Sequence, residues 1–424
     1  MKRLGQFTTE ELFDFSYTCG CGRVHAFKAP RIVTDEPVGA IAELLGSGRV
    51  MIVSADDVDQ TTPDGLERAL LKRGYKVDRL NALPFSPIFD VQEIEDDVRL
   101  LIAYGGSALI EFCKLVAFRL DIKLVAFPVG FEYGCVLSDD AVLVSEGRAV
   151  KVEAKRPDLV VIDYDGLMRA GEDVIASGYG RVLACMVGIY DYYFAGKVYG
   201  TPFCTEIMNA TLIAATRVIK EEGDVRSRYG LRLLSDSALR LAIFAEIAGN
   251  ISGGEHQLAV TLERYLAVRT RDKRLFGENL YISAVLVSGL YKTFLRAKPF
   301  RLTVPPARCR SVVMMRRLLM IPDTYSLGFL RGYTPAKTVD EFKLNLFREE
   351  LLDVAEKIHL LVLEGQNVMR RVYSDAGFFM KYYVGTEEML ALLTLAPDYA
   401  EGQTLLTYVK DCGLMEHFER RTLA

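Results

Sequence analysis

Histidine is scarce in this sequence, tryptophan is absent, and the net charge is small. Only four histidines occur among 424 residues, and no two of them lie within two helical turns, which argues against a site built from paired histidines. The net charge of −4 argues against a general binder of nucleic acid or of membrane surfaces. No run of about 18 apolar residues is present, and the N-terminus lacks the apolar core of a signal peptide. We therefore expect a cytoplasmic protein without nucleic-acid or membrane partners.

The eight cysteines are scattered, except for Cys19 and Cys21, which His25 follows closely. In a cytoplasmic chain they are expected to be reduced and mostly buried. A tetrahedral metal site needs a fourth ligand, and none lies nearby in the sequence. The stretch therefore favours a small turn-rich hairpin, with a metal site as the open alternative.

The composition is that of a soluble globular protein, since 50% of the residues are hydrophobic and 25% are charged. The length is enough for two domains, each with its own core. From about Asp165 onward the strand pattern gives way to helical spacing. We expect two domains, an α/β domain over residues 1–165 and an all-helical domain over residues 166–424.

One stretch organises the first domain. The apolar residues Leu100–Tyr104 run into Gly105 and Gly106, and apolar positions at helical spacing follow. This order predicts a buried strand, a tight turn and a helix start. Glycines let a backbone approach a phosphate, and a helix N-terminus offers N–H groups and partial positive charge. We expect a dinucleotide pyrophosphate on Gly105, Gly106 and Ser107, while a turn that binds nothing is the simpler interpretation.

Strands and helices alternate around this turn, which predicts a mostly parallel sheet with helices on both faces. The expected strands are Val50–Ser54, Tyr75–Val77, Asp97–Tyr104, Lys123–Phe127 and Asp158–Ile162. Ligands of such sheets lie at the carboxyl ends of the strands. The expected site therefore includes Asp56, the glycine turn, and the loops after Pro128 and Ile162. Asp56 would favour a ribose hydroxyl, but the choice between NAD and NADP stays open.

The second domain is expected to consist of helices. The expected segments are Leu167–Asn209, Asn209–Glu222, Ser235–Asn250, Glu255–Val268 and Tyr281–Leu295. Thr338, followed by Glu341, has the pattern of a capping box that opens a further helix. A cleft between a sheet domain and a helical domain is a common place for catalysis.

Seven segments in chain order carry the motifs of one family. They are Cys19–His25, Gly105–Lys114, Arg156–Asp163, Ser177–Leu183, Asp191-Tyr192, Ser252–His256 and Leu275–Glu278. Together they resemble the glycerol-1-phosphate dehydrogenase branch of the iron-containing alcohol dehydrogenase superfamily, which includes dehydroquinate synthase. The resemblance implies an N-terminal Rossmann-like parallel-sheet domain followed by an all-α domain.

The resemblance also implies a nucleotide site. Gly105–Lys114 is similar to the family's GGGxxxDxxK pyrophosphate turn, with Ser107 in place of the third glycine and Glu111 in place of the aspartate. The implied cofactor is NAD or NADP, bound by Asp56, Gly105, Gly106, Ser107, Glu111, Lys114 and Val129. Glu111 and Lys114 have an alternative interpretation as an ordinary surface pair of one helix.

The chain departs from the family at the metal site. The family holds a divalent metal with one aspartate and two histidines, and the matching positions here are Arg181, His256 and Phe276. A guanidinium repels a cation and a phenyl ring has no lone pair, so only His256 could act as a ligand. No catalytic metal is therefore expected. The family's substrate loop is also altered, since Val129, Phe131 and Tyr133 replace its polar residues, and Gly402–Thr404 replaces its Arg-Tyr-Thr segment.

Three functions follow from this pattern. The first is an oxidoreductase that acts on a phosphorylated polyol or ketose, with a homodimer as a possible assembly. In it Arg181 polarises the substrate oxygen and His256 transfers the proton. A simpler role for Arg181 is an ion pair with Glu255 or Asp191. The second is an inactive nucleotide-binding homologue that works through a partner. A cyclase of the dehydroquinate synthase type ranks last.

Overall fold

The computed structural model describes residues 2–34, 37–55, 58–82, 94, 96–145, 148–221, 223–249, 251–269, 275–297, 309–321, 341–373, 384–400, 402, 404–411 and 415. The chain divides into two compact units. The sheet unit comprises residues 7–178 and 223–247, and the helical unit comprises residues 1–6, 179–222 and 248–424. The expected domain boundary after residue 165 stays a prediction.

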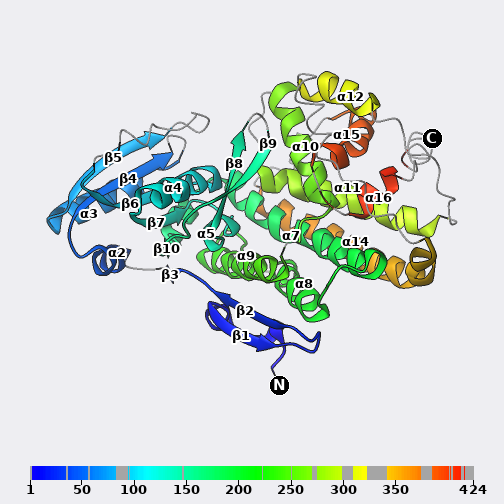
Figure 1. Ribbon diagram of the computed structural model, residues 1–424, viewed down its shortest axis with the longest axis horizontal. Coiled ribbons are helices and arrows are strands. Elements are labelled where there is room, and N and C mark those ends of the chain that lie inside the picture. The colour runs from blue at the N-terminus through cyan, green and yellow to red at the C-terminus, as the bar shows by residue number, and fades with distance from the viewer. Residues whose placement is uncertain are drawn as a thin grey trace. The chain divides into compact units, whose positions relative to one another are not determined.

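The sheet unit is built on six parallel strands in the order β3-β10-β7-β6-β4-β5 (Figure 1). Their bounds are β3 (Arg31–Val33), β4 (Arg49–Ala55), β5 (Lys76–Ala82), β6 (Val98–Gly105), β7 (Lys123–Pro128) and β10 (Leu159–Val161). The five expected strands and the parallel α/β fold are confirmed. The short edge strand β3 was not predicted, because three residues carry too little pattern.

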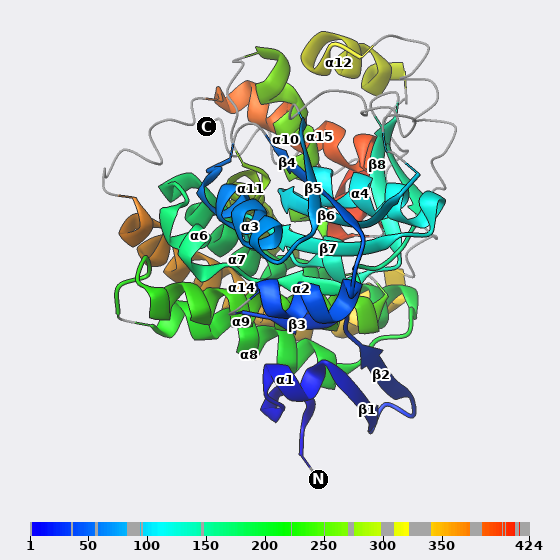
Figure 2. The ribbon, with the colours of Figure 1, turned by 90° about the vertical axis from the view of Figure 1, so that its left-hand side faces the viewer.

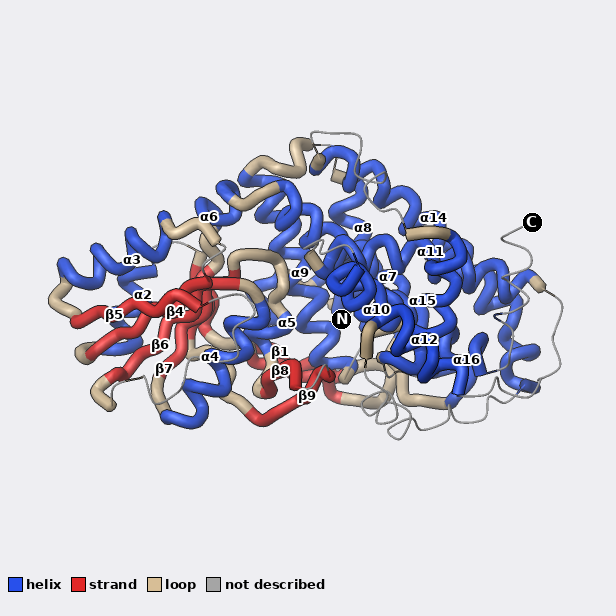
Figure 3. Tube along the Cα trace, turned by 90° about the horizontal axis from the view of Figure 1, so that it is seen from above, coloured by secondary structure: helices blue, strands red, loops and turns tan. Residues whose placement is uncertain are grey.

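Helices cover both faces of this sheet (Figure 3). Helices α2 (Pro37–Leu45) and α3 (Thr61–Lys72) share one core with the strand residues Val50, Ile52 and Leu100. Successive strand residues point to opposite faces, and helix α4 (Ser107–Leu120) contacts β6 and β7 from the other side. The central strands are therefore buried on both faces, which explains their almost unbroken apolar sequences.

The strand order places the glycine turn where ligands bind in such sheets. Along the sheet, β5, β4, β6, β7 and β10 follow the doubly wound order 2-1-3-4-5, which reverses direction between β4 and β6. Gly105 ends β6, and a Cβ atom built on it would lie 3.5 Å from the Cβ of Ala55 at the end of β4. The turn thus lies at the topological switch point, where doubly wound folds bind nucleotides.

The remaining elements of the sheet unit are two antiparallel hairpins and several helices. The hairpins pair β1 (Asp14–Thr18) with β2 (Val24–Lys28) and β8 (Asp140–Ser145) with β9 (Arg148–Glu153). The helices are α1 (Thr9–Leu12), α5 (Gly134–Leu137), α6 (Tyr164–Arg169) and α9 (Arg228–Ala248). The hairpin expected around Cys19 is confirmed, whereas the β8–β9 hairpin was not predicted.

The described elements of the helical unit are almost all helices. They are α7 (Glu172–Phe194), which begins in the sheet unit, α8 (Thr205–Lys220), α10 (Gly254–Arg269), α11 (Phe276–Arg296), α12 (Cys309–Leu319), α14 (Glu341–Val372), α15 (Thr386–Tyr399) and α16 (Leu405–Asp411). None of the described helices is both long and apolar enough to cross a membrane. Of the expected capping box, Thr338 lies outside the described residues and Glu341 begins α14.

The single helix expected over Leu167–Asn209 is wrong. The segment forms α6, α7, a short π-helix over Ala195–Tyr199 and the start of α8. Gly200 adopts a left-handed conformation with φ of 70°, and Pro202 follows it without a backbone N–H to continue a helix. These two residues turn the chain before α8.

Candidate functional site

The glycine turn has the geometry of an anion-binding helix start. Gly106 is the N-cap of α4 and makes no side-chain cap hydrogen bond. A Cβ on Gly105 would lie 2.6 Å from the Cδ2 of Leu109, whereas a Cβ on Gly106 would meet nothing within 4 Å. Gly105 is therefore required by packing, and Gly106 faces open space. The first N–H groups of α4, including that of the half-buried Ser107, can approach a phosphate there.

Glu111 and Lys114 form a buried ion pair one turn further along α4. Lys114 Nζ lies 3.0 Å from Glu111 Oε2, the lysine side chain is fully buried, and its ammonium also donates to the backbone oxygen of Asp140 at the start of β8. Burial raises the pKa of Glu111, and the charge of Lys114 opposes this shift. The interpretation of the two residues as a surface pair is therefore wrong. They attach α4 to β8, and their contact with a nucleotide stays a prediction.

The loop after β7 is fixed by its own packing. The N–H of Val129 donates to the oxygen of Gly105 over 3.2 Å, which joins this loop to the glycine turn. Phe131 is buried against Gly178, where an added Cβ would lie 2.3 Å from its ring. Tyr133 is also buried, and its hydroxyl lies 3.0 Å from Ser235 Oγ. Both aromatic rings therefore stabilise the sheet unit.

A polar cluster lies at the same edge of the sheet, and of its members the sequence analysis had included only Asp163, in the loop after Ile162. Thr62 Oγ1 donates to Asp163 Oδ2 over 2.5 Å, and Arg169 bonds both Thr62 and Asp59. Hydrogen bonds from Thr61 and Arg169 lower the pKa of Asp59 to about 2. Thr62 follows β4, so the rule that ligands gather at strand ends, which had already pointed to the loop of Asp163, could also have found Thr62. Asp56, which was expected here, lies outside the described residues.

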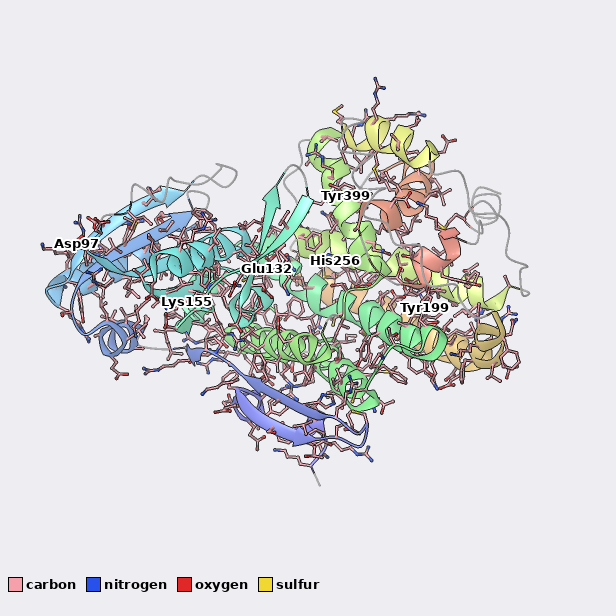
Figure 4. All side chains as sticks on the ribbon, in the orientation of Figure 1. Asp97, Glu132, Lys155, Tyr199, His256 and Tyr399 are labelled. Atoms are coloured by element: carbon pink, nitrogen blue, oxygen red, sulfur yellow. The ribbon has the colours of Figure 1, made fainter. Side chains whose placement is uncertain are left out.

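The helical unit brings together the three residues that were expected at the family's metal positions. The guanidinium carbon of Arg181 on α7 lies 5.2 Å from the ring centre of Phe276, and the ring of His256 lies edge-on to Phe276 at 5.5 Å. His256 is labelled on α10 in Figure 4. Helices α7 and α11 approach closely at Gly180, which leaves room for no side chain. A Cβ added to Gly180 would lie 2.2 Å from the backbone oxygen of Gly277. Phe276 thus touches both polar side chains.

This set of side chains does not fit a divalent metal. Catalytic zinc takes three protein ligands with lone pairs, and His256 alone among the three supplies one. Burial, and then the positive charge of Arg181, lower the pKa of His256 to about 4. At neutral pH the cluster therefore offers a permanent cation and an uncharged imidazole that can accept a proton.

Asp191 holds the start of the helix that carries His256. Its carboxylate accepts hydrogen bonds from the N–H of Gly254 at 2.7 Å, the N–H of Leu405 at 2.8 Å and the hydroxyl of Tyr291 at 2.8 Å. Burial raises its pKa to about 6. Among the described residues these three donors hold Asp191, and Arg181 is not one of them. Asp191 is a positioning residue: the sequence singled it out within a family segment and as a possible partner of Arg181, but did not predict these three donors.

Glu255 is a second buried acid beside Asp191. Gly253 comes so close to both that an added Cβ would lie 2.5 Å from an oxygen of each carboxyl group. Burial, and then the charge of Asp191, raise the pKa of Glu255 well above its ordinary value. The two acids and Gly253 fix the turn before α10.

The segment that replaces the family's Arg-Tyr-Thr supports the same helix. Thr404 is buried, and its hydroxyl donates to Gln257 Oε1 over 2.7 Å. Leu405 follows with its bond to Asp191. Gln403 lies outside the described residues. This part of the chain therefore secures the position of α10.

Sequence comparison finds relatives named glycerol-1-phosphate dehydrogenase (NAD(P)+). The Pyrococcus furiosus protein is 24% identical over 269 residues, which are 61% of this chain and 76% of the relative. The Pyrococcus horikoshii protein is 26% identical over 208 residues, 47% of this chain and 59% of the relative, and the Bacillus licheniformis protein is 20% identical over 277 residues, 64% of this chain and 66% of the relative. No family model matches the chain.

Solved structures share the fold at low identity. An iron-containing alcohol dehydrogenase from Thermococcus thioreducens has a TM-score of 0.52 and 15% identity, with 93% of this chain and 99% of that chain covered. Sulfoacetaldehyde reductase from Bifidobacterium kashiwanohense, solved in complex with NAD+, has a TM-score of 0.53 and 13% identity, with 93% and 96% covered. The fold expected from the sequence is confirmed by these likenesses.

Proposed function

We propose that this chain, a divergent member of the glycerol-1-phosphate dehydrogenase branch of the iron-containing alcohol dehydrogenase superfamily, acts as an oxidoreductase. It would use NAD or NADP and work without a catalytic metal. Its substrate would be dihydroxyacetone phosphate, glycerol phosphate or a related phosphorylated polyol. The contact of Arg181 and His256 around Phe276 carries this proposal, because it puts a fixed cation beside a proton acceptor.

The glycine turn supports a dinucleotide. When bound, NAD(P) accepts or supplies the hydride. The N–H groups at Gly106 and Ser107 bind its pyrophosphate, since the turn is open there and lies at the switch point of the sheet. Gly105 and Val129 hold the turn in shape through their mutual hydrogen bond.

Arg181 takes the electrostatic role that a metal has in the family. As an alcohol is oxidised, negative charge builds on its oxygen while the hydroxyl proton leaves and the C–H electron pair departs as hydride. The guanidinium stabilises that oxygen, and the neutral imidazole of His256 accepts the proton. In the reverse direction the imidazolium returns the proton to the oxygen of the reduced carbonyl.

The alternative of an inactive nucleotide-binding homologue rests on different observations. Phe131 and Tyr133 are buried where the family has polar substrate-loop residues, and Phe276 has no donor atom. Such a protein would keep the glycine turn, because binding there uses backbone groups. It would bind NADH or NADPH and turn over no polyol phosphate.

A two-part experiment separates these functions. NADH and NADPH are titrated by fluorescence, and turnover with dihydroxyacetone phosphate is followed with and without EDTA. Micromolar binding with turnover that EDTA leaves unchanged supports the proposal. Binding without turnover of this or related polyol phosphates supports the inactive homologue. Turnover that EDTA abolishes contradicts the metal-free mechanism, and the absence of nucleotide binding contradicts both functions.

A further inference from the structure

Strands β1 and β2 form an antiparallel hairpin (Figure 2). The hairpin gathers three side chains that play no part in the proposed oxidoreductase. Its turn spans residues 19–23, where the N–H of Cys19 donates to the oxygen of Arg23 over 2.9 Å. Gly22 has φ of 82°, and this left-handed residue closes the turn tightly. The turn brings Cys19, Cys21 and His25 to one place although the chain reverses between them.

The distances between these side chains are close to those of a tetrahedral metal site. Cys21 Sγ lies 3.4 Å from His25 Nε2, and the ligand atoms of Cys19, Cys21 and His25 all lie within 4.8 Å of one another. Bond lengths of about 2.3 Å to sulfur and about 2.0 Å to nitrogen place such ligands roughly 3.5 to 3.8 Å apart around zinc. The thiols and the imidazole are therefore close to ligating positions.

Burial at the turn also suits a metal. Cys19 is 5% exposed and His25 is 4% exposed, so two of the three groups are withdrawn from water. Cys21 is the exposed member of the set, so an ion can reach the three side chains from the solvent.

We propose that the β1–β2 turn is a structural site for a thiophilic divalent cation, with zinc as the expected ion, bound by Cys19, Cys21 and His25. Two thiolates and one imidazole are a ligand set that zinc prefers. A hairpin with two strands of five residues is marginal by itself, and a cross-link through its turn stabilises it. The fourth position belongs to water or to a further side chain.

Zinc content of the purified full-length protein tests this site. Elemental analysis should find stoichiometric zinc, and Cys19→Ser, Cys21→Ser and His25→Gln should each lose most of it. Cys135→Ser is the matched control, because it removes a thiol outside the hairpin and a serine hydroxyl can keep the hydrogen bond that Cys135 donates to the oxygen of Glu132. Full zinc content in this control, together with loss in the hairpin variants, supports the site.

X-ray absorption of the wild-type protein gives a measurement that does not depend on variants folding. Two or three sulfur neighbours around zinc support the proposal, and fewer than two overturn it. The proposal is also overturned if the protein neither contains zinc nor takes it up in a titration. A Cys19–Cys21 disulfide that persists in the presence of a reducing agent overturns it as well. Zinc that is lost with His256→Ala and kept by the hairpin variants overturns this site and the metal-free oxidoreductase together. A metal-free hairpin with EDTA-resistant turnover overturns this site alone.

Discussion

The glycine turn of the sheet unit and the Arg181–Phe276–His256 cluster of the helical unit have changed to different extents relative to the family. The turn offers backbone N–H groups at the start of α4, so Ser107 and Glu111 can replace the family's residues without removing these donors. The cluster consists of side-chain atoms, and in our proposal two substitutions replace metal ligands with a cation and a phenyl ring that contact each other. Binding that relies on the backbone tolerates sequence change, whereas chemistry that relies on side chains changes with it.

The largest expected effect is on the cluster. Arg181→Ala should lower kcat by about 100-fold or more, because the oxygen loses its electrostatic partner. The affinity for NADH or NADPH should stay the same, since the turn is untouched. Arg181→Lys, which keeps the charge, should retain part of the activity. Steady-state rates and nucleotide titrations check this, and an unchanged rate in Arg181→Ala removes this residue from the mechanism.

A second change restores the family's ligands. Arg181→Asp combined with Phe276→His places one carboxylate and two imidazoles at the matching positions, and the double variant should bind a divalent metal there. Each single variant supplies one ligand fewer and should bind far more weakly. Isothermal titration with nickel or zinc, in a background where the hairpin cysteines are serine, measures this binding. If the double variant binds no better than the background, the assignment of these positions is wrong.

The third prediction breaks the turn and leaves the cluster intact. Gly106→Asp should weaken NADH or NADPH binding by at least about 10-fold, because a carboxylate at the start of α4 opposes a phosphate. Gly106→Ala is the control, since φ of −74° suits alanine and a Cβ there meets no atom within 4 Å. Equal affinities of the two variants would contradict a nucleotide at this turn.

The smallest expected effect concerns the support of the cluster. Folding raises the pKa of Asp191 from 3.8 to about 6, so this group favours the folded state most below pH 4 and loses that contribution as the pH rises through 6. The change amounts to about 2 to 3 kcal/mol. Asp191→Asn should flatten this part of the stability curve, whereas the exposed Asp353→Asn should not. Urea unfolding between pH 4 and pH 7 gives both curves, and parallel slopes would contradict the assignment.

Much of the sheet unit could be predicted because its signals are local. Apolar runs such as Leu100–Tyr104, followed by glycine and then by helical spacing, specify a strand, a turn and a helix within fifteen residues. The long helix expected across Gly200 failed for the opposite reason, since the apolar spacing continued past residues whose backbone ends a helix. The hairpin at Cys19 was predicted, but the distances that make it a candidate metal site were not.

The sequence by itself determined the parallel fold and the place of the glycine turn, and it supplied the proposed match of Arg181, His256 and Phe276 to the family's metal positions. Only the tertiary structure decided that Arg181, Phe276 and His256 touch, that Lys114 is buried rather than exposed, and that Leu405 donates to an aspartate 214 positions earlier in the chain. The physical reason is the separation in sequence of the residues that determine each feature. Strands and turns follow from neighbouring residues, whereas burial and the partner of a charge depend on helices that meet only when the chain has folded.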